Sequence, residues 1–322
     1  MLVLSRRDVE AALDPGRLVD AVAAAMADMS AGNGSFPNRT GADVAGVSGV
    51  LIAMPAYVAG AGALAAKLVA MFPQNASTGL PTHKAIVAVF DPATGTPEAV
   101  MDGEVVTAMR TAAGSALSAR LLARDDAAVL AILGTGVQAR AHADAVRRVR
   151  PIREVRIAGR DPSKVQALAE GLGGVAAGSF EEAVAGADIV CACTHSADPV
   201  VRGSWLRPGA HVTSVGYNPQ GRELDADVLA GALVVVESRA AALAPYPSGS
   251  NDLLWPIRDG VFGEDHVHAE IGELVAGTRP GRTDAGQITV YKSVGVAAQD
   301  AAAAALVLQA ARQLGLGADV EV

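Results

Sequence analysis

The stretch Val129-Leu-Ala-Ile-Leu-Gly134-Thr-Gly136-Val-Gln-Ala139 runs from an apolar segment through two glycines into residues with helical spacing. Each small residue meets a separate physical need: Gly134 allows a tight turn, Gly136 lets the backbone approach a pyrophosphate, and Ala139 lets the helix pack on the strand. Val137 and Gln138 then place free N–H groups and the positive end of the helix dipole beside the phosphates. The stretch therefore predicts a dinucleotide-binding turn.

Strand and helix patterns alternate from residue 127 onward. We expect strands at 128–133, 154–158, 174–177, 188–192, 211–215 and 233–236, and helices at about 137–149, 162–171 and 179–185. This alternation is typical of a parallel, doubly wound sheet with right-handed crossovers. The predicted fold class is therefore α/β.

About 120 residues precede that unit, and they mix helix and strand patterns. We expect helices at 14–29 and 104–124, with the clearest strand at 85–90. A strand at 287–291 and an alanine-rich helix at 294–314 follow the unit, and 249–268 is interpreted as an irregular insertion. The chain thus combines a Rossmann domain with an α+β domain.

Composition limits the classes of partner. With 322 residues, 51% of them hydrophobic and 19% charged, the chain suits two well-buried domains. A formal net charge of −8 gives no reason to expect nucleic acid or an anionic membrane as partner. The uncharged span 44–66 is interrupted by glycines and Pro55, which favours buried sheet over a membrane helix. Cys191 and Cys193 alternate along one predicted strand, and the chain start lacks a signal-peptide pattern, so we expect a reduced, cytoplasmic protein.

The end of the second Rossmann strand indicates the cofactor. NAD-binding units carry an acidic residue there to bind the ribose hydroxyls, whereas this strand ends in Gly159 and Arg160. A guanidinium can hold the 2′-phosphate of NADP(H) through charge-assisted hydrogen bonds. Asp161 falls one or two positions too late for the ribose contact. We therefore expect NADP(H), with NAD(H) as the alternative and an exposed, solvated Arg160 as the competing explanation.

Basic side chains in the first segment are few and stand among apolar residues. Lys67 lies in the run Ala65-Ala-Lys67-Leu-Val69, where a cation is costly unless an anion meets it. Arg39, Lys67 and Arg110 would suit a substrate carboxylate if they converge, although a structural ion pair is the simpler explanation for each alone. The pair His266 and His268 has no third ligand at a suitable spacing, so no metal site is predicted.

The chain resembles the ornithine cyclodeaminase/mu-crystallin family over nearly its whole length. The matching motifs are Gly79-Leu-Pro-Thr-His83-Lys84, Val100–Ala113, Gly134–Ala139, Ala187–Val190, Trp205–Gly209, Arg222–Asp225 and Ser293–Asp300. The resemblance implies that residues 1–120, together with the C-terminal helix at about 294–322, bind substrate and form a homodimer. Residues 121–293 would then be the Rossmann domain.

By the same resemblance, family residues with known roles have counterparts here. Arg39, Lys67 and Arg110 match those that bind the substrate carboxylate. Thr111 and Thr194 match residues near the cofactor, and Val294 falls near the nicotinamide.

One departure from the family changes the expected reaction. Cyclodeaminases carry an aspartate shortly after the glycine of the fifth Rossmann strand, but here Tyr217 and Asn218 follow Gly216. Asparagine can position an amine, yet it cannot take its proton at neutral pH. The carboxylate that cyclodeaminases carry just before the Met54-Pro55 pair is also missing. Mu-crystallin-like members, which are NADPH-dependent ketimine reductases, lack the aspartate too.

We therefore expect reduction of a small cyclic or linear ketimine, such as Δ1-pyrroline-2-carboxylate, to an L-amino acid. Lys67 or His83 would supply the proton, and Asn218 would contact the substrate. Three alternatives stay open. The first is an ornithine cyclodeaminase, the second an alanine or opine-type amino-acid dehydrogenase, and the third a non-catalytic, cofactor-binding protein.

Overall fold

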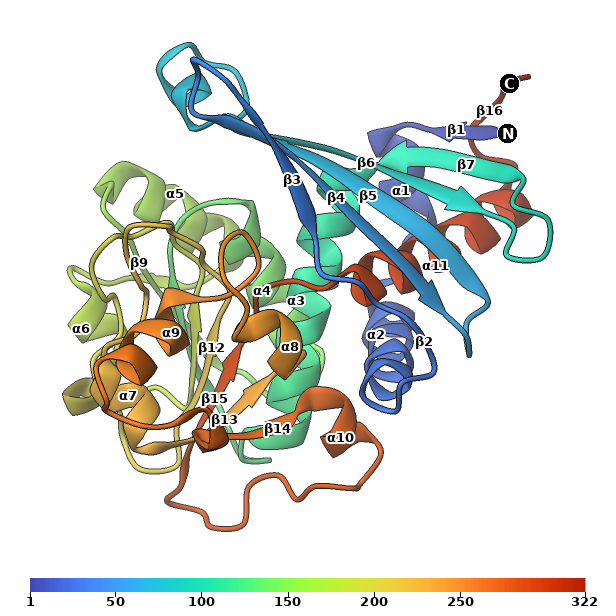
Figure 1. Cartoon of the computed structure of the whole chain (residues 1–322). Helices are drawn as coiled ribbons and strands as arrows, with labels where there is room; N and C mark the ends of the chain where they lie inside the picture. Colours follow the sequence, from blue (N-terminus) through green and yellow to red (C-terminus); the bar gives the residue numbers. More distant parts are fainter. Residues whose placement is uncertain (322) are drawn as a thin grey trace. The chain divides into compact units, whose positions relative to one another are not determined.

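Two compact units make up the chain in the computed structural model, which describes residues 1–321 (Figure 1). The first unit comprises Met1–Arg110 and the chain from Val296 onward, and the second comprises Thr111–Gly295. The first boundary falls inside helix α3 (Gly103–Leu122), ten residues before the one expected from the sequence. Arg110 and Thr111 are therefore neighbours on one helix but belong to different units.

The second unit is built on a fully parallel sheet. Its strands are β8 (Val129–Leu133), β9 (Glu154–Ala158), β10 (Val175–Ala176), β11 (Ile189–Ala192), β12 (His211–Ser214), β13 (Ala232–Val236), β14 (Val267–Glu270) and β15 (Ile288–Lys292). Their order is β10-β9-β8-β11-β12-β15-β13-β14. The chain winds outward from β8 in one direction and from β11 in the other. The switch point, where such sheets bind ligands, therefore lies between these two strands.

Helices cover both faces of this sheet, as the predicted doubly wound fold requires (Figure 1). They are α4 (Val137–Arg147), α5 (Pro162–Leu172), α6 (Phe180–Val184), α7 (Ala226–Ala230), α8 (Arg239–Ala242), α9 (Asn251–Arg258) and α10 (Ile271–Val275). Ala143 of α4 and Leu168 of α5 pack with one apolar cluster, while Ala183 of α6 and Leu253 of α9 pack with the other. The predicted α/β class is confirmed, and the expected elements match to within a few residues.

The expectation of an irregular insertion at 249–268 is wrong. This segment contains α9 and the first residues of β14. The hydroxyl of Ser250 accepts a hydrogen bond from the Asp252 N–H and so caps the helix, and Leu253 and Pro256 are buried on its inner side. Pro256 and the nearby glycines disfavour a helix, so the sequence pattern did not predict α9. The helix forms because burial of its apolar residues outweighs this unfavourable local propensity.

Two buried histidines connect helices to the sheet of this unit. His142 donates from Nδ1 to the Gln138 carbonyl (2.7 Å), so its Nε2 accepts from the hydroxyl of Ser115 (2.9 Å). His211 Nε2 lies 3.1 Å from the hydroxyl of Ser118. Burial lowers the pKa of His142 to about 4 and that of His211 to about 3. Both imidazoles are therefore neutral at pH 7.

The first unit is built on a mostly antiparallel sheet. Its strands are β1 (Leu2–Leu4), β2 (Gly34–Ser35), β3 (Thr40–Val44), β4 (Gly49–Val58), β5 (Ala63–Met71), β6 (His83–Phe90), β7 (Pro97–Asp102) and β16 (Ala318–Asp319). The order is β16-β1-β7-β6-β5-β4-β2, and β3 pairs with β4 as well. The uncharged span 44–66 forms β4 and the start of β5, as sheet was predicted there.

Helices α1 (Arg6–Ala12), α2 (Pro15–Ser30) and α11 (Ala297–Leu314) complete the first unit (Figure 1). Helix α11 packs on α2 and on β4, β5 and β6. Met54, Lys67 and Val87 lie opposite one another on β4, β5 and β6 and are all buried. Lys67 is therefore the charged member of an apolar row on the helix-covered face. No helix within residues 1–321 is both long and apolar enough to cross a membrane.

Candidate functional site

The glycine turn after β8 has the geometry that a dinucleotide requires. Gly134 has φ = +114°, and a Cβ there would lie 2.5 Å from the carbonyl oxygen of Cys193, so a side chain is excluded. A Cβ at Gly136 would meet nothing within 4 Å. Gly136 is the N-cap of α4, and no side chain of the described residues caps this helix. Open space therefore lies beside N–H groups at the positive end of the helix, which suits a pyrophosphate.

One further detail of the turn fits a bound nucleotide. The Val137 side chain is 66% exposed, although it directly follows the turn. The amide oxygen of Gln138, in contrast, is buried and has no hydrogen-bond partner among the described residues. Nucleotide binding by Gly134, Gly136, Val137 and Gln138, which lie together at the end of β8, stays a prediction.

The end of β9 carries a cation where NAD-specific units carry an acid. Arg160 follows Gly159 and is exposed. Asp161 is the N-cap of α5, and its Oδ1 accepts hydrogen bonds from the N–H groups of Ser163 (3.0 Å) and Lys164 (3.2 Å). Its carboxylate is thus committed to the helix, and Arg160 stands at the sequence position where NAD-binding units carry an acid.

In the first unit, a buried cluster joins three elements. Lys67 of β5 places Nζ 3.0 Å from Oδ1 and 2.9 Å from Oδ2 of Asp300 on α11. Arg110 of α3 places Nε 2.9 Å from the same Oδ1, and its Nη1 donates to the Gln299 side-chain carbonyl at 3.0 Å. Lys67 is 2% exposed, Arg110 5% and Asp300 1%. Two buried cations therefore share one carboxylate, which leaves this trio with a net positive charge.

The charges in this cluster affect each other strongly. Burial lowers the pKa of Lys67 to about 8, and the charges of Arg110 and Arg39 lower it too, whereas Asp300 opposes them. Burial alone would raise the pKa of Asp300, but the charges of Arg110 and Lys67 outweigh that effect and hold it below its usual value. At pH 7 the cluster therefore holds an ionised Asp300 and a mostly protonated Lys67.

Arg39 and His83 stand in different relations to this cluster. Arg39 is half-buried in the segment before β3, and its charge acts on Lys67. His83 is exposed at the start of β6, with Nδ1 3.0 Å from the hydroxyl of Thr82. Lys67 pairs with Val87, so His83 lies four residues, or about 13 Å, further along the strand. The structure thus brings Lys67 and Arg110 together and leaves His83 apart.

The other predicted residues lie at ends of Rossmann strands or on α3. Thr111 is buried on α3. Thr194 follows β11 and donates to Glu223 (2.7 Å), and the Val294 N–H follows β15 and donates to Glu237 (2.7 Å). The Asn218 side chain binds the backbone of two loops: Oδ1 accepts from the Gln220 N–H (2.8 Å) in its own loop, and Nδ2 donates to the His195 carbonyl (3.3 Å) in the loop after β11. Contact of Asn218 with substrate stays a prediction.

Three buried acids, Asp300, Glu223 and Glu237, organise these segments, and no role was predicted for them from the sequence. Asp300 lies in a quoted motif but is 233 positions from Lys67. Glu223 lies in another quoted motif, and Glu237 directly follows the apolar strand β13. A carboxylate in an otherwise apolar context was the available signal, because buried acids need specific donors.

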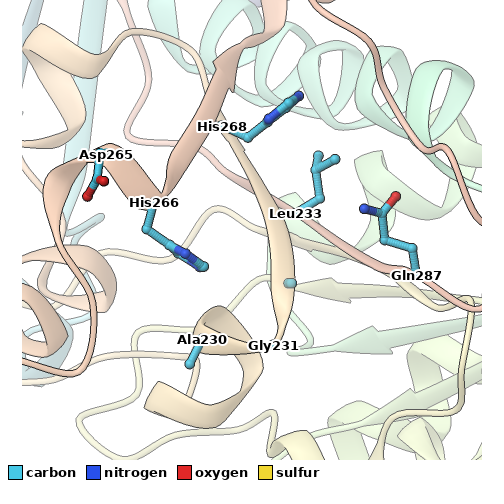
Figure 2. Close-up of a pocket in the computed structure, with 8 residues that line it drawn as sticks. Ala230, Gly231, Leu233, Asp265, His266, His268 and Gln287 are labelled. Carbon is cyan, nitrogen blue, oxygen red and sulfur yellow. The ribbon is translucent and has the colours of Figure 1, made fainter.

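A hollow of about 410 Å³ lies at the opposite, amino-terminal edge of the Rossmann sheet (Figure 2). His266 and His268 line it, but Nε2 of each donates to a backbone carbonyl, of Leu229 (2.7 Å) and Pro280 (2.9 Å) respectively. Within residues 1–321, no three His, Cys, Asp or Glu side chains are grouped so that they could hold a metal ion. Because its lining residues lie at the amino ends of the strands, this hollow is separate from the glycine turn at their carboxyl ends.

Comparisons with known proteins find similar proteins over nearly the whole chain. The profile of the ornithine cyclodeaminase/mu-crystallin family matches residues 1–314. Ketimine reductase mu-crystallin of Mus musculus is 39% identical over 296 residues, which cover 90% of each chain. The structure of Thermococcus litoralis Δ1-pyrroline-2-carboxylate reductase in complex with NADH and L-proline has a TM-score of 0.94 and 36% identity, and the match covers 99% of this chain and 100% of that one. An archaeal alanine dehydrogenase dimer with bound NAD has a TM-score of 0.92 and 32% identity, covering 100% and 99% of the two chains.

Proposed function

Because this chain belongs to the ornithine cyclodeaminase/mu-crystallin family, we propose that it reduces a small cyclic or linear ketimine acid to an L-amino acid with a nicotinamide nucleotide. The observation that carries this proposal is the buried cluster of Lys67, Arg110 and Asp300. Its net positive charge would be balanced by a substrate carboxylate, which a guanidinium can bind through two parallel hydrogen bonds. The mammalian and archaeal relatives named as imine reductases support the same chemistry.

Lys67 is the proton donor in this proposal. An ammonium has three N–H bonds, and one of them donates to Oδ1 of Asp300, while Oδ2 lies 2.9 Å from Nζ as an ion-pair contact. A remaining N–H bond can protonate the imine nitrogen, and a protonated imine is the better hydride acceptor. A pKa of about 8 keeps most Lys67 protonated at pH 7 and still allows the proton to leave. The bound nucleotide supplies the hydride, so the C=N bond gains one hydride and one proton.

Arg39 and Arg110 hold the substrate carboxylate in this mechanism. Asp300 orients both Lys67 and Arg110, and Asn218 stiffens the loop after β12. The missing aspartate beside Asn218 argues against deamination, because no carboxylate there can take a proton from a second amine.

We also propose that the chain prefers NADP(H). The exposed Arg160 and the commitment of Asp161 to the cap of α5 support this preference. Replacing Arg160 by alanine should raise the KM for NADPH at least tenfold and change the KM for NADH less than threefold. A wild-type enzyme that uses NADH better than NADPH would overturn the preference.

A homodimer through the first unit is part of the same proposal. Helices cover one face of its sheet, while Leu51 (45% exposed) and Ile86 (46%) lie on the other face. Large exposed apolar side chains on a sheet face are typical of an interface. Light scattering should therefore give twice the chain mass, and Leu51→Lys should shift it toward the monomer. For the location we propose the cytoplasm, supported by the unpaired Cys191 and Cys193.

The decisive experiment is a steady-state assay of NADPH oxidation. Δ1-Pyrroline-2-carboxylate should be reduced to proline without added ammonia, and Lys67→Met should abolish turnover while circular dichroism stays unchanged. Activity confined to pyruvate plus ammonia would replace the proposal with an alanine dehydrogenase, as the archaeal neighbour would suggest. Release of ammonia and proline from ornithine would identify a cyclodeaminase. Nucleotide binding with no turnover of any imine would indicate a non-catalytic binder.

A further inference from the structure

Glu223 is a buried carboxylate whose two oxygens accept four hydrogen bonds. Oε1 accepts from the backbone N–H (2.6 Å) and the hydroxyl (2.7 Å) of Thr194. Oε2 accepts from the hydroxyl of Ser214 and from the N–H of Gly216, both at 2.7 Å. Thr194 lies just beyond β11, whereas Ser214 ends β12 and Gly216 follows it. A single side chain, 2% exposed, therefore ties together the carboxyl ends of two neighbouring parallel strands.

Lys292, at the end of β15, holds the other side of the same peptide segment. Its Nζ donates to the hydroxyl of Ser214 (2.9 Å) and to the carbonyl of Gly216 (2.8 Å), and it pairs with Asp252 (2.9 Å). The N–H of Gly216 thus meets an anion and its carbonyl meets a cation. Charge-assisted hydrogen bonds of this kind are roughly twice as strong as neutral ones, so the segment has little freedom to shift.

The backbone is packed closely here. A Cβ at Gly216 would lie 2.2 Å from the Thr194 carbonyl oxygen and 2.3 Å from Cδ of Glu223. Beyond Gly216, the side-chain amide of Asn251 donates to the carbonyls of Asn218 (3.1 Å), Pro219 (3.2 Å) and Gly221 (3.1 Å). The loop is therefore held from its first residue to its last.

The four hydrogen bonds of Glu223, called the clamp below, lie at the edge of the sheet where a nucleotide binds. In open parallel sheets the nucleotide lies outside the carboxyl ends of the strands at the switch point, which here lies between β8 and β11. We propose that Glu223 is a positioning residue for hydride transfer. It holds Thr194 and Gly216 in place as two walls of the nicotinamide pocket, and Lys292 holds the carbonyl side of Gly216. The inference rests on the proposed function, and it adds residues that touch neither substrate nor cofactor.

Glu223→Gln tests the clamp directly. An amide puts an NH₂ group where two donors need an acceptor, so either Thr194 or Gly216 loses its partner. Hydrogen exchange at these two amides should become at least tenfold faster. The kcat for imine reduction should fall at least tenfold, with the KM for the imine within threefold, because substrate binding depends on other residues. Ser214→Ala removes only the hydroxyl between Glu223 and Lys292 and should give smaller changes in the same direction.

Asp188→Asn is the matched control. Asp188 is also a buried carboxylate beside β11, but it lies at the amino end of this strand, where it accepts from the N–H groups of Ala128 and Val129 (both 2.9 Å) and pairs with Arg124 (2.7 Å) and Arg207 (3.0 Å). Asp188→Asn should cost at least as much stability as Glu223→Gln and leave kcat unchanged. An equal fall in kcat for Asp188→Asn would show a general loss of stability and overturn the proposal.

Normal exchange at Thr194 and Gly216 in Glu223→Gln, or a kcat within twofold of wild type, would overturn the clamp as well. If Glu223→Gln does not fold, Ser214→Ala decides by the same two measurements. Failure of the proposed function is distinguished from failure of the clamp by the wild-type assay, since the wild type would then reduce no imine. Hydrogen exchange and a fluorescence titration with NADPH would then still test whether Glu223 shapes the nucleotide pocket, with a tenfold weaker NADPH affinity expected for Glu223→Gln.

Discussion

Asp300→Asn should destabilise the first unit strongly, because it removes the carboxylate that Lys67 and Arg110 share. Both cations are at least 95% buried and lie within 3.0 Å of Asp300. Removing one partner of a buried ion pair costs about 3–5 kcal/mol, since it leaves an uncompensated charge in a poorly solvated site. Here two charges lose their partner, so we expect a loss at the upper end of that range at pH 7.

The assay is urea unfolding at pH 7, with Glu98→Gln as control. Glu98 of β7 pairs with Arg312 at 2.7 Å, so this pair also joins α11 to the sheet. Its side chains are 24% and 54% exposed, and water screens such a pair, so its loss should cost less than about 1 kcal/mol. The two variants therefore compare a buried and an exposed ion pair between the same helix and the same sheet.

The pH dependence gives a second readout with a defined sign. The folded-state pKa of Lys67, about 8, is below its unfolded value of 10.5, so between these values the unfolded chain binds more protons. The Lys67 contribution to stability therefore rises with pH in this window. Without Asp300 the Lys67 pKa falls further, so the rise should begin below pH 8 in the variant. The reasoning would be refuted if Asp300→Asn lowered the free energy of unfolding by less than about 1 kcal/mol, as Glu98→Gln is expected to do, and kept the pH dependence of the wild type.

Three further predictions concern the glycine turn, the proton of Lys67 and the two buried histidines. Gly134→Ala should prevent the β8 turn from forming and lower the melting temperature sharply. Gly136→Ala should instead melt normally but bind NADPH at least tenfold more weakly by fluorescence titration; equal stabilities would contradict the geometry. The kcat/KM for imine reduction should fall as pH rises through about 8, where Lys67 loses its proton, and a flat profile up to pH 9.5 would exclude Lys67 as the donor. Acid should destabilise the protein below pH 6.5, because His142 and His211 stay neutral when folded and become protonated when unfolded. Each should contribute a loss of about 2 kcal/mol by pH 5, and His142→Gln should show a weaker pH dependence in urea unfolding.

Local sequence was enough to predict the nucleotide turn and most of the second unit. The positive φ of Gly134 and the N-cap position of Gly136 are local features, and apolar strands alternate with helices at regular spacing. The helix α9 was missed because Pro256 and nearby glycines disfavour helix locally, whereas Leu253 is buried in the apolar core.

For the cluster of Lys67, Arg110 and Asp300, the sequence predicted that Lys67 needs an anion but did not identify Asp300 as that anion. A lysine in the apolar run 65–69 already required an anion, but no spacing rule connects Lys67 with Asp300, 233 positions away. The same holds for Glu223, whose partners lie on two different strand ends. Side chains that meet across strands and helices are determined by tertiary packing, and a single sequence does not encode that packing in any local pattern.

The return of α11 to the first unit has a consequence for biosynthesis. A ribosome makes β5 and most of α3 early, but Asp300 emerges only after the whole of Thr111–Gly295. Until then Lys67 and Arg110 have no Asp300 to neutralise them, and the sheet face that α11 covers is bare. The Rossmann unit can therefore fold on the growing chain, whereas the first unit is completed only after α11 has emerged. A nascent chain stalled before residue 296 should expose that apolar face to chaperones.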